Sequence, residues 1–255
     1  MLPRAFFRAS SAPVFLATIL LGGLSACVSQ KRMERAVAQS DLGAAYYREG
    51  NPEAAIEALR RATDLDPRNW RAVNLLAIAY LAKGMPDLAE AEFDRALRIN
   101  PTEAEILVNY GALKLRQGKN EEAVEVFTRA LADLDYRNVA LVLSNLSLAY
   151  SESGQYDNAV ETAREATRRA PTLCQGWFHL GIAEEKRGHT DDAVAAYESL
   201  VKYCPGEADG AQVRMACLQA RGPVPEIGRN ALRDLVEQTR GTPLGDQARD
   251  CLTGS

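Results

Sequence analysis

The chain has 255 residues, with 30 Lys and Arg against 34 Asp and Glu, so its net charge is −4. Apolar residues make up 47% and charged residues 25%, an ordinary globular composition that excludes intrinsic disorder, a collagen-like fibre and a multi-span membrane protein. The acidic balance also argues against nucleic-acid binding, because nucleic-acid binders usually carry a basic face.

The N-terminus has the pattern of a bacterial lipoprotein export signal. Arg4 and Arg8 precede an uncharged apolar run over residues 12–24, which has the length of a secretory signal core. The run ends in Leu-Ser-Ala-Cys at residues 24–27, which resembles a lipobox. We therefore predict a signal peptide over residues 1–26 and acyl chains on Cys27. An ordinary signal peptide that happens to end near a cysteine is the alternative.

The predicted mature chain begins at Cys27, has 229 residues and carries 28 − 34 = −6 charges. Val28 follows the cysteine, where an Asp would signal retention at the inner membrane in enteric-type sorting. The pattern therefore predicts a lipid anchor in the periplasmic leaflet of the outer membrane. Residues 27–35 are expected to be a short lipidated tether, and the eight residues between Cys27 and Ala36 span at most about 28 Å when extended.

A period of about 34 residues runs through the mature chain. Alanines recur 34 or 36 residues apart at Ala55, Ala89, Ala123, Ala159 and Ala193. Glycines keep the same steps at Gly50, Gly84, Gly118, Gly154 and Gly188, and prolines follow at Pro67, Pro101, Pro171 and Pro205. Asp135 stands where the third proline is expected, and residues 138–139 are an insertion, which predicts an irregular junction there.

Each unit also repeats a large, a small and a large residue. The sets are Leu42/Gly43/Tyr46, Leu76/Ala77/Tyr80, Tyr110/Gly111/Lys114, Leu146/Ser147/Tyr150 and Leu180/Gly181/Glu184. This pattern resembles the tetratricopeptide repeat, a pair of antiparallel helices, A and B. The small residue allows the two helices to approach closely, the glycine caps helix A, and the proline ends helix B.

The resemblance implies an all-α, right-handed superhelical solenoid of about six repeats with a C-terminal capping helix. We place the repeats at 36–69, 70–103, 104–137, 140–173, 174–207 and, in degenerate form, 208–241, followed by a capping helix and tail at 242–255. Gly222-Pro223 breaks the pattern in the sixth unit. An atypical last unit is expected, because no neighbour covers its apolar face.

Four cysteines remain after lipidation, at Cys174, Cys204, Cys217 and Cys251. They allow three pairings. The repeat places Cys174 at the start of a helix A and Cys204 at the end of its antiparallel partner, and it places Cys217 beneath the terminal helix that carries Cys251. These positions favour the pairs 174–204 and 217–251. Four buried free thiols are the alternative.

Motifs of enzymatic chemistry are missing from the sequence. We find no P-loop, GxGxxG, GxSxG or HExxH pattern, and we predict no enzyme activity, no cofactor and no metal site. His179 is expected to be packed on a helix A, and His189 to be solvated in a turn. The acidic pairs Glu184-Glu185 and Asp191-Asp192 are expected on solvated faces, where they complement helix dipoles.

Protein binding is then the expected role. In the tetratricopeptide repeat family, helix A positions 2, 5, 9 and 12 line the concave face. Apolar and amide side chains at or beside these positions predict a groove for an amphipathic helix or an apolar peptide. The candidate residues are Asn74, Ile78, Leu81, Val108, Asn109, Leu115, Leu141, Asn145, Leu148, Phe178 and Ile182.

Curvature or the terminal helix could instead cover these side chains. Phe178 is expected to contact the partner without a core role, so that Phe178→Ala would weaken binding and leave the melting temperature nearly unchanged. The lysine clamp with which some family members hold a carboxyl terminus needs lysines at positions 2 and 5, and this chain has none there.

The lipobox, the short tether and the repeats together resemble the type IV pilus pilotin family (PilF/PilW/Tgl). That resemblance implies an outer-membrane lipoprotein that binds the pilus secretin, brings it to the membrane and promotes its multimerisation, and on which pilus extension and twitching or gliding motility depend. It implies no nucleic acid and no small-molecule substrate. A lipoprotein scaffold for β-barrel assembly or for peptidoglycan hydrolases is the alternative. The sequence does not identify the secretin segment, its orientation or the stoichiometry.

Overall fold

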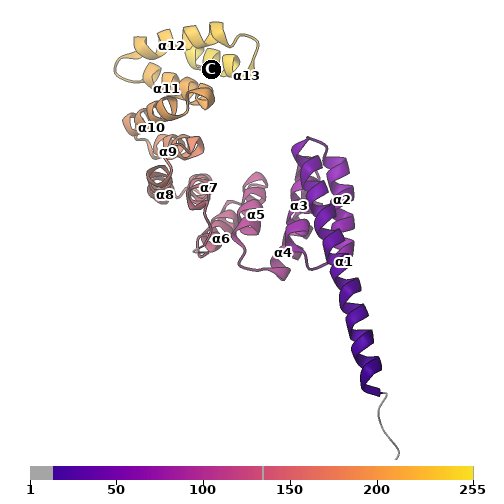
Figure 1. Ribbon diagram of the computed structural model, residues 1–255. Coiled ribbons are helices and arrows are strands. Elements are labelled where there is room, and N and C mark those ends of the chain that lie inside the picture. The colour runs from indigo at the N-terminus through magenta and orange to yellow at the C-terminus, as the bar shows by residue number, and fades with distance from the viewer. Residues whose placement is uncertain (1–13, 134, 255) are drawn as a thin grey trace, which may run out of the picture. The chain divides into compact units, whose positions relative to one another are not determined.

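The structure, a computed structural model, describes residues 14–133 and 135–254, with side chains from Gln30 onward. Its regular elements are helical in this part of the chain (Figure 1). The helices are α1 (Val14–Arg48), α2 (Pro52–Leu65), α3 (Trp70–Ala82), α4 (Pro86–Ile99), α5 (Ala104–Arg116), α6 (Asn120–Ala130), α7 (Val139–Glu152), α8 (Tyr156–Arg169), α9 (Cys174–Arg187), α10 (Thr190–Tyr203), the short 3-10 helix η1 (Pro205–Glu207), α11 (Asp209–Arg221), α12 (Pro225–Gln238) and α13 (Pro243–Thr253). The predicted all-α class is confirmed.

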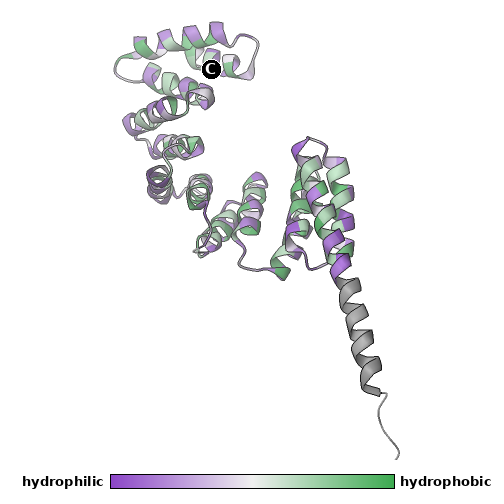
Figure 2. Ribbon diagram, in the orientation of Figure 1, coloured by the Kyte–Doolittle hydropathy of each residue, from purple (hydrophilic) through white to green (hydrophobic). Residues whose placement is uncertain are grey.

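The helices pack in sequential pairs within two compact units, one up to Pro101 and one from Thr102. In the first unit α1 packs on α2, α2 on α3 and α3 on α4. In the second unit the pairs α5/α6, α7/α8, α9/α10 and α11/α12 each contact the next pair, and α13 packs on α11 and α12. Hydrophilic and hydrophobic residues are interspersed along the individual helices, as expected for helices that bury one side and expose the other (Figure 2).

The turn inside each of the first five pairs is made by a glycine with left-handed backbone, whereas Gly222, between α11 and α12, has φ −83°. Gly50, Gly84, Gly118, Gly154 and Gly188 have φ angles of +74°, +74°, +72°, +79° and +87°. Side chains with a Cβ rarely adopt this region, whereas glycine does so without steric cost. The spacing of 34 or 36 residues between these glycines therefore reflects one turn geometry that the first five repeats share.

Close approach of the two helices in a pair depends on a residue without a side chain. A Cβ added to Gly111 would lie 2.7 Å from the ring of Phe127, and one added to Gly43 would lie 2.5 Å from Leu59. Gly181 faces the ring of Tyr197 still more closely. The large residue of helix B fills the volume that the glycine leaves open, and Leu59, Phe127 and Tyr197 are fully buried there.

In the fourth and sixth repeats the two helices of the pair approach each other in a different way. In the fourth, the small residue is Ser147, whose hydroxyl donates to the carbonyl of Ala159 at 2.8 Å. In the sixth, the 34-residue step leads to Met215, and the close approach instead occurs at Gly228 of α12, whose Cβ would collide with the backbone of Ala220 in α11. The degenerate unit therefore keeps its helix pair by placing the small residue on helix B.

The junction after the third unit is irregular, as predicted. Helix α6 has 11 residues and ends at Ala130, whereas α2, α4, α8 and α10 have 14. The chain then runs through Asp135, in place of the usual proline, to the start of α7 at Val139. Of the two inserted residues, Asn138 is the N-cap of α7 and Val139 is its first residue, so the insertion lies at the start of α7, which has 14 residues.

Residues 27–35, the predicted lipidated tether, lie within a long helix. Helix α1 continues without interruption from Val14 to Arg48, so that residues 27–35 are helical rather than extended. No proline occurs between Val14 and Asn51, and nothing else in this stretch ends a helix until Gly50. The side chain of Cys27 and the positively charged start of the predicted signal peptide lie outside the described residues.

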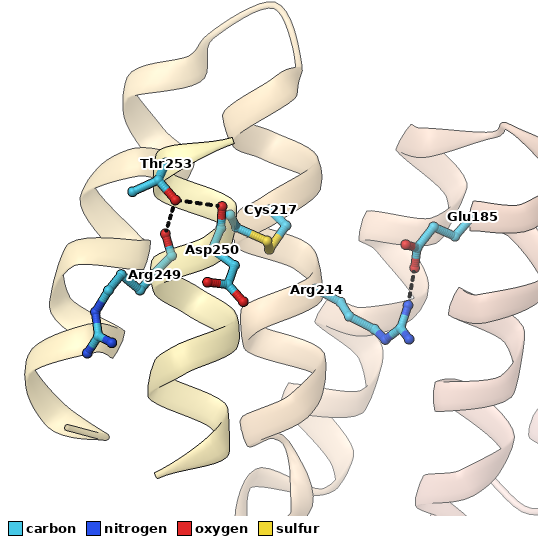
Figure 3. Close-up of a disulfide and its surroundings, with 7 residues drawn as sticks. Glu185, Arg214, Cys217, Arg249, Asp250 and Thr253 are labelled. Atoms are coloured by element: carbon cyan, nitrogen blue, oxygen red, sulfur yellow. Dashed lines mark hydrogen bonds and ion pairs between the residues drawn. A yellow bond between two sulfur atoms is a disulfide. The ribbon is translucent and has the colours of Figure 1, made fainter. Parts of the chain in front are cut away.

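Two disulfides join the cysteine pairs that the helix positions favoured. Cys174, the first residue of α9, bonds to Cys204 just after α10, with the Cα atoms 5.8 Å apart. Cys217 of α11 bonds to Cys251 of α13, with the Cα atoms 5.6 Å apart (Figure 3). The second bridge fastens the terminal helix onto the last pair, whose core contains Val213, Leu232 and Ala248.

We expect Gly181→Ala to lower the free energy of unfolding by about 1–3 kcal/mol, because the new methyl group must displace the buried ring of Tyr197. Gly210→Ala, in the first turn of α11, is the matched control, since an added Cβ meets no heavy atom within 4 Å there. Urea unfolding of both variants measures the difference. Equal stability of the two variants would contradict the proposed role of the close approach.

Candidate protein-binding face

Helices α7 and α9, the A helices of two successive pairs in the second unit, pack directly against each other. On α7, Leu141, Asn145 and Leu148 are spaced by four and three residues, so they share one side of the helix, and each is half-buried. On α9, Phe178 and Ile182 share one side in the same way and are also half-buried. Together these residues offer partly exposed apolar surface beside an amide group, a combination suited to a helical peptide.

Phe178 has a packing role that the sequence analysis did not assign to it. Its ring lies 6.1 Å from that of Tyr197, between ring centroids, and the guanidinium of Arg214 lies 5.9 Å from its centre. Phe178 also packs against the core cluster that contains Tyr197 and Leu200. The expectation that Phe178→Ala would leave stability unchanged is therefore corrected, since truncation would remove contacts between α9, α10 and α11.

A buried hydrogen bond joins α7 to α9 beneath this face. Nδ1 of His179 donates to the carbonyl oxygen of Ser144 at 2.8 Å and lies 2.9 Å from the hydroxyl oxygen of the same residue. Ser144 is fully buried and His179 is 9% exposed. Burial lowers the pKa of His179, and the hydrogen bond to Ser144 opposes that shift only in part. His179 is therefore a neutral structural residue, as expected.

A polar network fixes α9, α10 and α11 relative to one another. The hydroxyl of Tyr197 donates to Oε2 of Glu185 at 2.8 Å, and Arg214 donates to the same oxygen at 2.9 Å. The ion pair between Arg214 and Glu185 is visible beside the Cys217 disulfide in Figure 3. Burial, reinforced by the neighbouring Glu185 carboxylate, raises the pKa of Tyr197, which keeps its phenol protonated as the donor.

The other predicted contact residues separate into accessible and inaccessible ones. Asn74 of α3 has no exposed area and Val108 of α5 has 7%, so neither is available to a partner, and these two assignments are corrected. Both are at helix A position 5, as is the fully buried Ser144 of α7, whereas Phe178 at that position of α9 is half-buried. Four predicted contact residues remain half-buried: Ile78 and Leu81 in the compact unit that ends at Pro101, and Asn109 and Leu115 in the one that begins at Thr102.

Glu184 lies in a buried environment that the sequence pattern did not predict. It was expected on a solvated face, but it is 1% exposed, and its Oε1 accepts a hydrogen bond from Arg164 at 2.7 Å. Glu184 occupies the repeat position of Tyr80, whose hydroxyl accepts in the same way from Arg60 at 2.9 Å. The repeat alignment, which expects a large buried residue at this position, was the signal that could have identified it.

Comparison with known proteins places the chain in a family. Tetratricopeptide repeat models match residues 40–104 and 144–208, and a second such model matches 102–172. The type IV pilus assembly protein PilF of Pseudomonas aeruginosa is 30% identical over 171 residues, which cover 62% of this chain and 68% of PilF.

Two solved structures have the same fold. One is reported as the crystal structure of PilW, a widely conserved type IV pilus biogenesis factor. It matches with a TM-score of 0.79 at 20% identity and covers 84% of this chain and 98% of PilW. The Pseudomonas aeruginosa PilF structure matches with a TM-score of 0.74 at 23% identity and covers 86% of this chain and 98% of that one.

The fold and the matched models define a tetratricopeptide repeat protein, in which pairs of helices build a protein-binding scaffold. Within that class, the chain belongs to the family of the PilF and PilW type IV pilus assembly proteins. The residues that the structure describes contain no helix that is both long enough and apolar enough to cross a bilayer.

The neutral state of His179 predicts a dependence of stability on pH. Because the pKa of His179 in the folded protein lies below its ordinary value near 6.5, the unfolded chain binds the proton more readily. The buried neutral imidazole of His179 therefore contributes its full stability above that value. The free energy of unfolding should fall as the pH is lowered from about 7 to about 5. Urea unfolding of the native protein and of His179→Asn at both pH values measures it. The variant should show a shallower fall, and parallel curves would contradict the assignment.

Proposed function

We propose that this protein is an outer-membrane lipoprotein that acts as a pilotin for the secretin of the type IV pilus. The observation that carries this proposal is the 30% identity to PilF over 171 residues, which span most of the repeats. The lipobox ending at Cys27 supports it independently, because acyl chains on this cysteine would attach the scaffold to a membrane. Pilus biogenesis and twitching or gliding motility would then depend on the protein.

The mechanism we propose is binding without catalysis. A segment of the secretin docks on the face formed by Leu141, Asn145 and Leu148 of α7 and by Ile182 of α9. The apolar side chains bury surface against the segment, and the Asn145 amide bonds its backbone. The buried bond between Ser144 and His179 and the disulfides keep the A helices in place, so little conformational entropy is lost on binding.

The acyl chains on Cys27 would hold the loaded complex at the periplasmic face of the outer membrane. Two or more chains are needed for stable attachment, which is what lipoprotein processing of a cysteine provides. A secretin subunit bound to such an anchor is concentrated at the membrane, where it meets other subunits. Multimer assembly would be promoted by this local concentration and not by any chemical step.

The anchor is tested by Cys27→Ala, with Val28→Ala as the control that alters the neighbouring residue and keeps the thiol. We expect Cys27→Ala to lose metabolic labelling with palmitate, to remain as a precursor and to reduce the heat-resistant secretin multimer seen on gels of outer membranes. The control should behave as the native protein. Palmitate labelling that persists in Cys27→Ala would overturn the assignment of the lipid to this residue.

The docking face is tested by the double variant Leu148→Ala, Ile182→Ala. Truncating a central contact of an interface typically costs about 2 kcal/mol, so we expect secretin capture from detergent extracts to weaken about thirtyfold or more. Tyr156→Ala, at the exposed start of α8, is the matched control on a helix B. The melting temperature of each variant is measured alongside, so that lost binding is separated from lost folding.

Unchanged capture by the folded double variant would remove this face from the proposal. Recovery of barrel-assembly factors or peptidoglycan hydrolases in place of secretin subunits would favour the alternative, a lipoprotein scaffold for those machines, and would overturn the pilotin role.

A further inference from the structure

The turn between α9 and α10 brings together three side chains that can act as metal ligands. Glu184 comes from the last turn of α9, His189 from the turn itself and Asp192 from the first turn of α10. Their ligand atoms all lie within 4.8 Å of one another. Nδ1 of His189 lies 3.5 Å from Oε2 of Glu184 and 3.6 Å from Oδ2 of Asp192.

The buried carboxylate of Glu184 is only half satisfied. Its Oε1 accepts from Arg164 at 2.7 Å, but its Oε2 is buried and has no hydrogen-bond partner among the described residues. Arg187 approaches Oε2 no closer than 3.8 Å, beyond hydrogen-bond length. A buried carboxylate oxygen without a donor costs free energy, because it has lost its water without gaining a substitute. This oxygen faces His189 and points to a ligand of positive charge.

The two distances from His189 to the carboxylates fit ligands of one small cation. In tetrahedral zinc sites the nitrogen and oxygen ligands lie about 2.0–2.2 Å from the metal, so neighbouring ligand atoms are about 3.3–3.6 Å apart. The two distances from His189 match that edge. Three protein ligands with one coordination position left to water form a common zinc arrangement, and a mixed imidazole and carboxylate set suits Zn²⁺ better than Mg²⁺ or Ca²⁺.

The neighbouring charges are compatible with a divalent cation. Two guanidinium groups lie close, but each has a carboxylate oxygen of its own. Arg164 is bonded to Oε1 of Glu184, and Nε of Arg187 lies 2.8 Å from the carboxylate of Asp157. Oε2 of Glu184 and the carboxylate of Asp192 remain for the cation. His179, the other histidine of the chain, is buried against Ser144, so His189 is the accessible imidazole.

We propose that Glu184, His189 and Asp192 form a binding site for a divalent transition metal, with Zn²⁺ as the best fit. The site closes the turn end of the α9/α10 pair, while the disulfide between Cys174 and Cys204 closes the opposite end. The helix pair is thereby cross-linked at both of its ends. The site is independent of the proposed pilotin role, because it lies in a turn and does not include the docking face.

The test is Zn²⁺ binding by the full chain, purified in detergent without a histidine tag and stripped with a chelator. Competition with a chromophoric zinc indicator measures the affinity. We expect His189→Ala and Asp192→Asn each to weaken Zn²⁺ binding at least about tenfold, and excess Mg²⁺ not to compete. Zn²⁺ should also raise the melting temperature of the native protein, and it should do so much less for the two variants.

Asp191→Asn is the matched control. It removes the same charge from the same helix turn, one residue away, but Asp191 is not among the three ligands. Its affinity should stay at the native value. Zinc held elsewhere is common to all the proteins and does not alter the comparison. Equal affinity of His189→Ala and the native protein would overturn the proposal, as would equal weakening by Asp191→Asn and Asp192→Asn.

Discussion

Packing within a helix pair depends on a steric constraint between its two helices, most clearly where helix A carries a glycine. A large side chain of helix B occupies the space that a missing or small side chain leaves on helix A, as Tyr197 does opposite Gly181. The distance between the two helices is set by this contact. Since each pair then presents the same apolar surfaces to the next pair, the repeat can be stacked many times with little change in sequence.

The end of the stack shows how the same constraint is met when the repeat pattern fades. In the sixth unit the small residue moves to helix B as Gly228, and α13 covers the surface that a further repeat would have covered. The bridge between Cys217 and Cys251 fastens this cover covalently. A short terminal helix buries little apolar area by itself, and the disulfide adds a covalent constraint that holds it in place.

The proposed docking face depends on polar contacts that lie under it. Ser144 and His179 connect two neighbouring A helices, and Glu185 connects α9 to α10 and α11 through Tyr197 and Arg214. Buried polar contacts are favourable only when every member is paired, so they specify one arrangement of the helices more sharply than apolar packing does. The half-buried leucines and isoleucine above them are therefore presented at fixed positions.

The sequence by itself determined the features that repeat. The period, the all-α class, the turn glycines and the small residue on helix A can be read from residue spacing, because each follows from backbone and packing geometry within one helix pair. The favoured disulfide pairs followed from the same geometry, since antiparallel helices bring the ends of a pair together. Tertiary structure decided what depends on contacts between pairs. It buried Asn74, joined Glu184 to Arg164 of the preceding pair and placed Phe178 against Arg214 of the next pair. These environments are set by how neighbouring helices meet, and a pattern within one repeat does not contain that information.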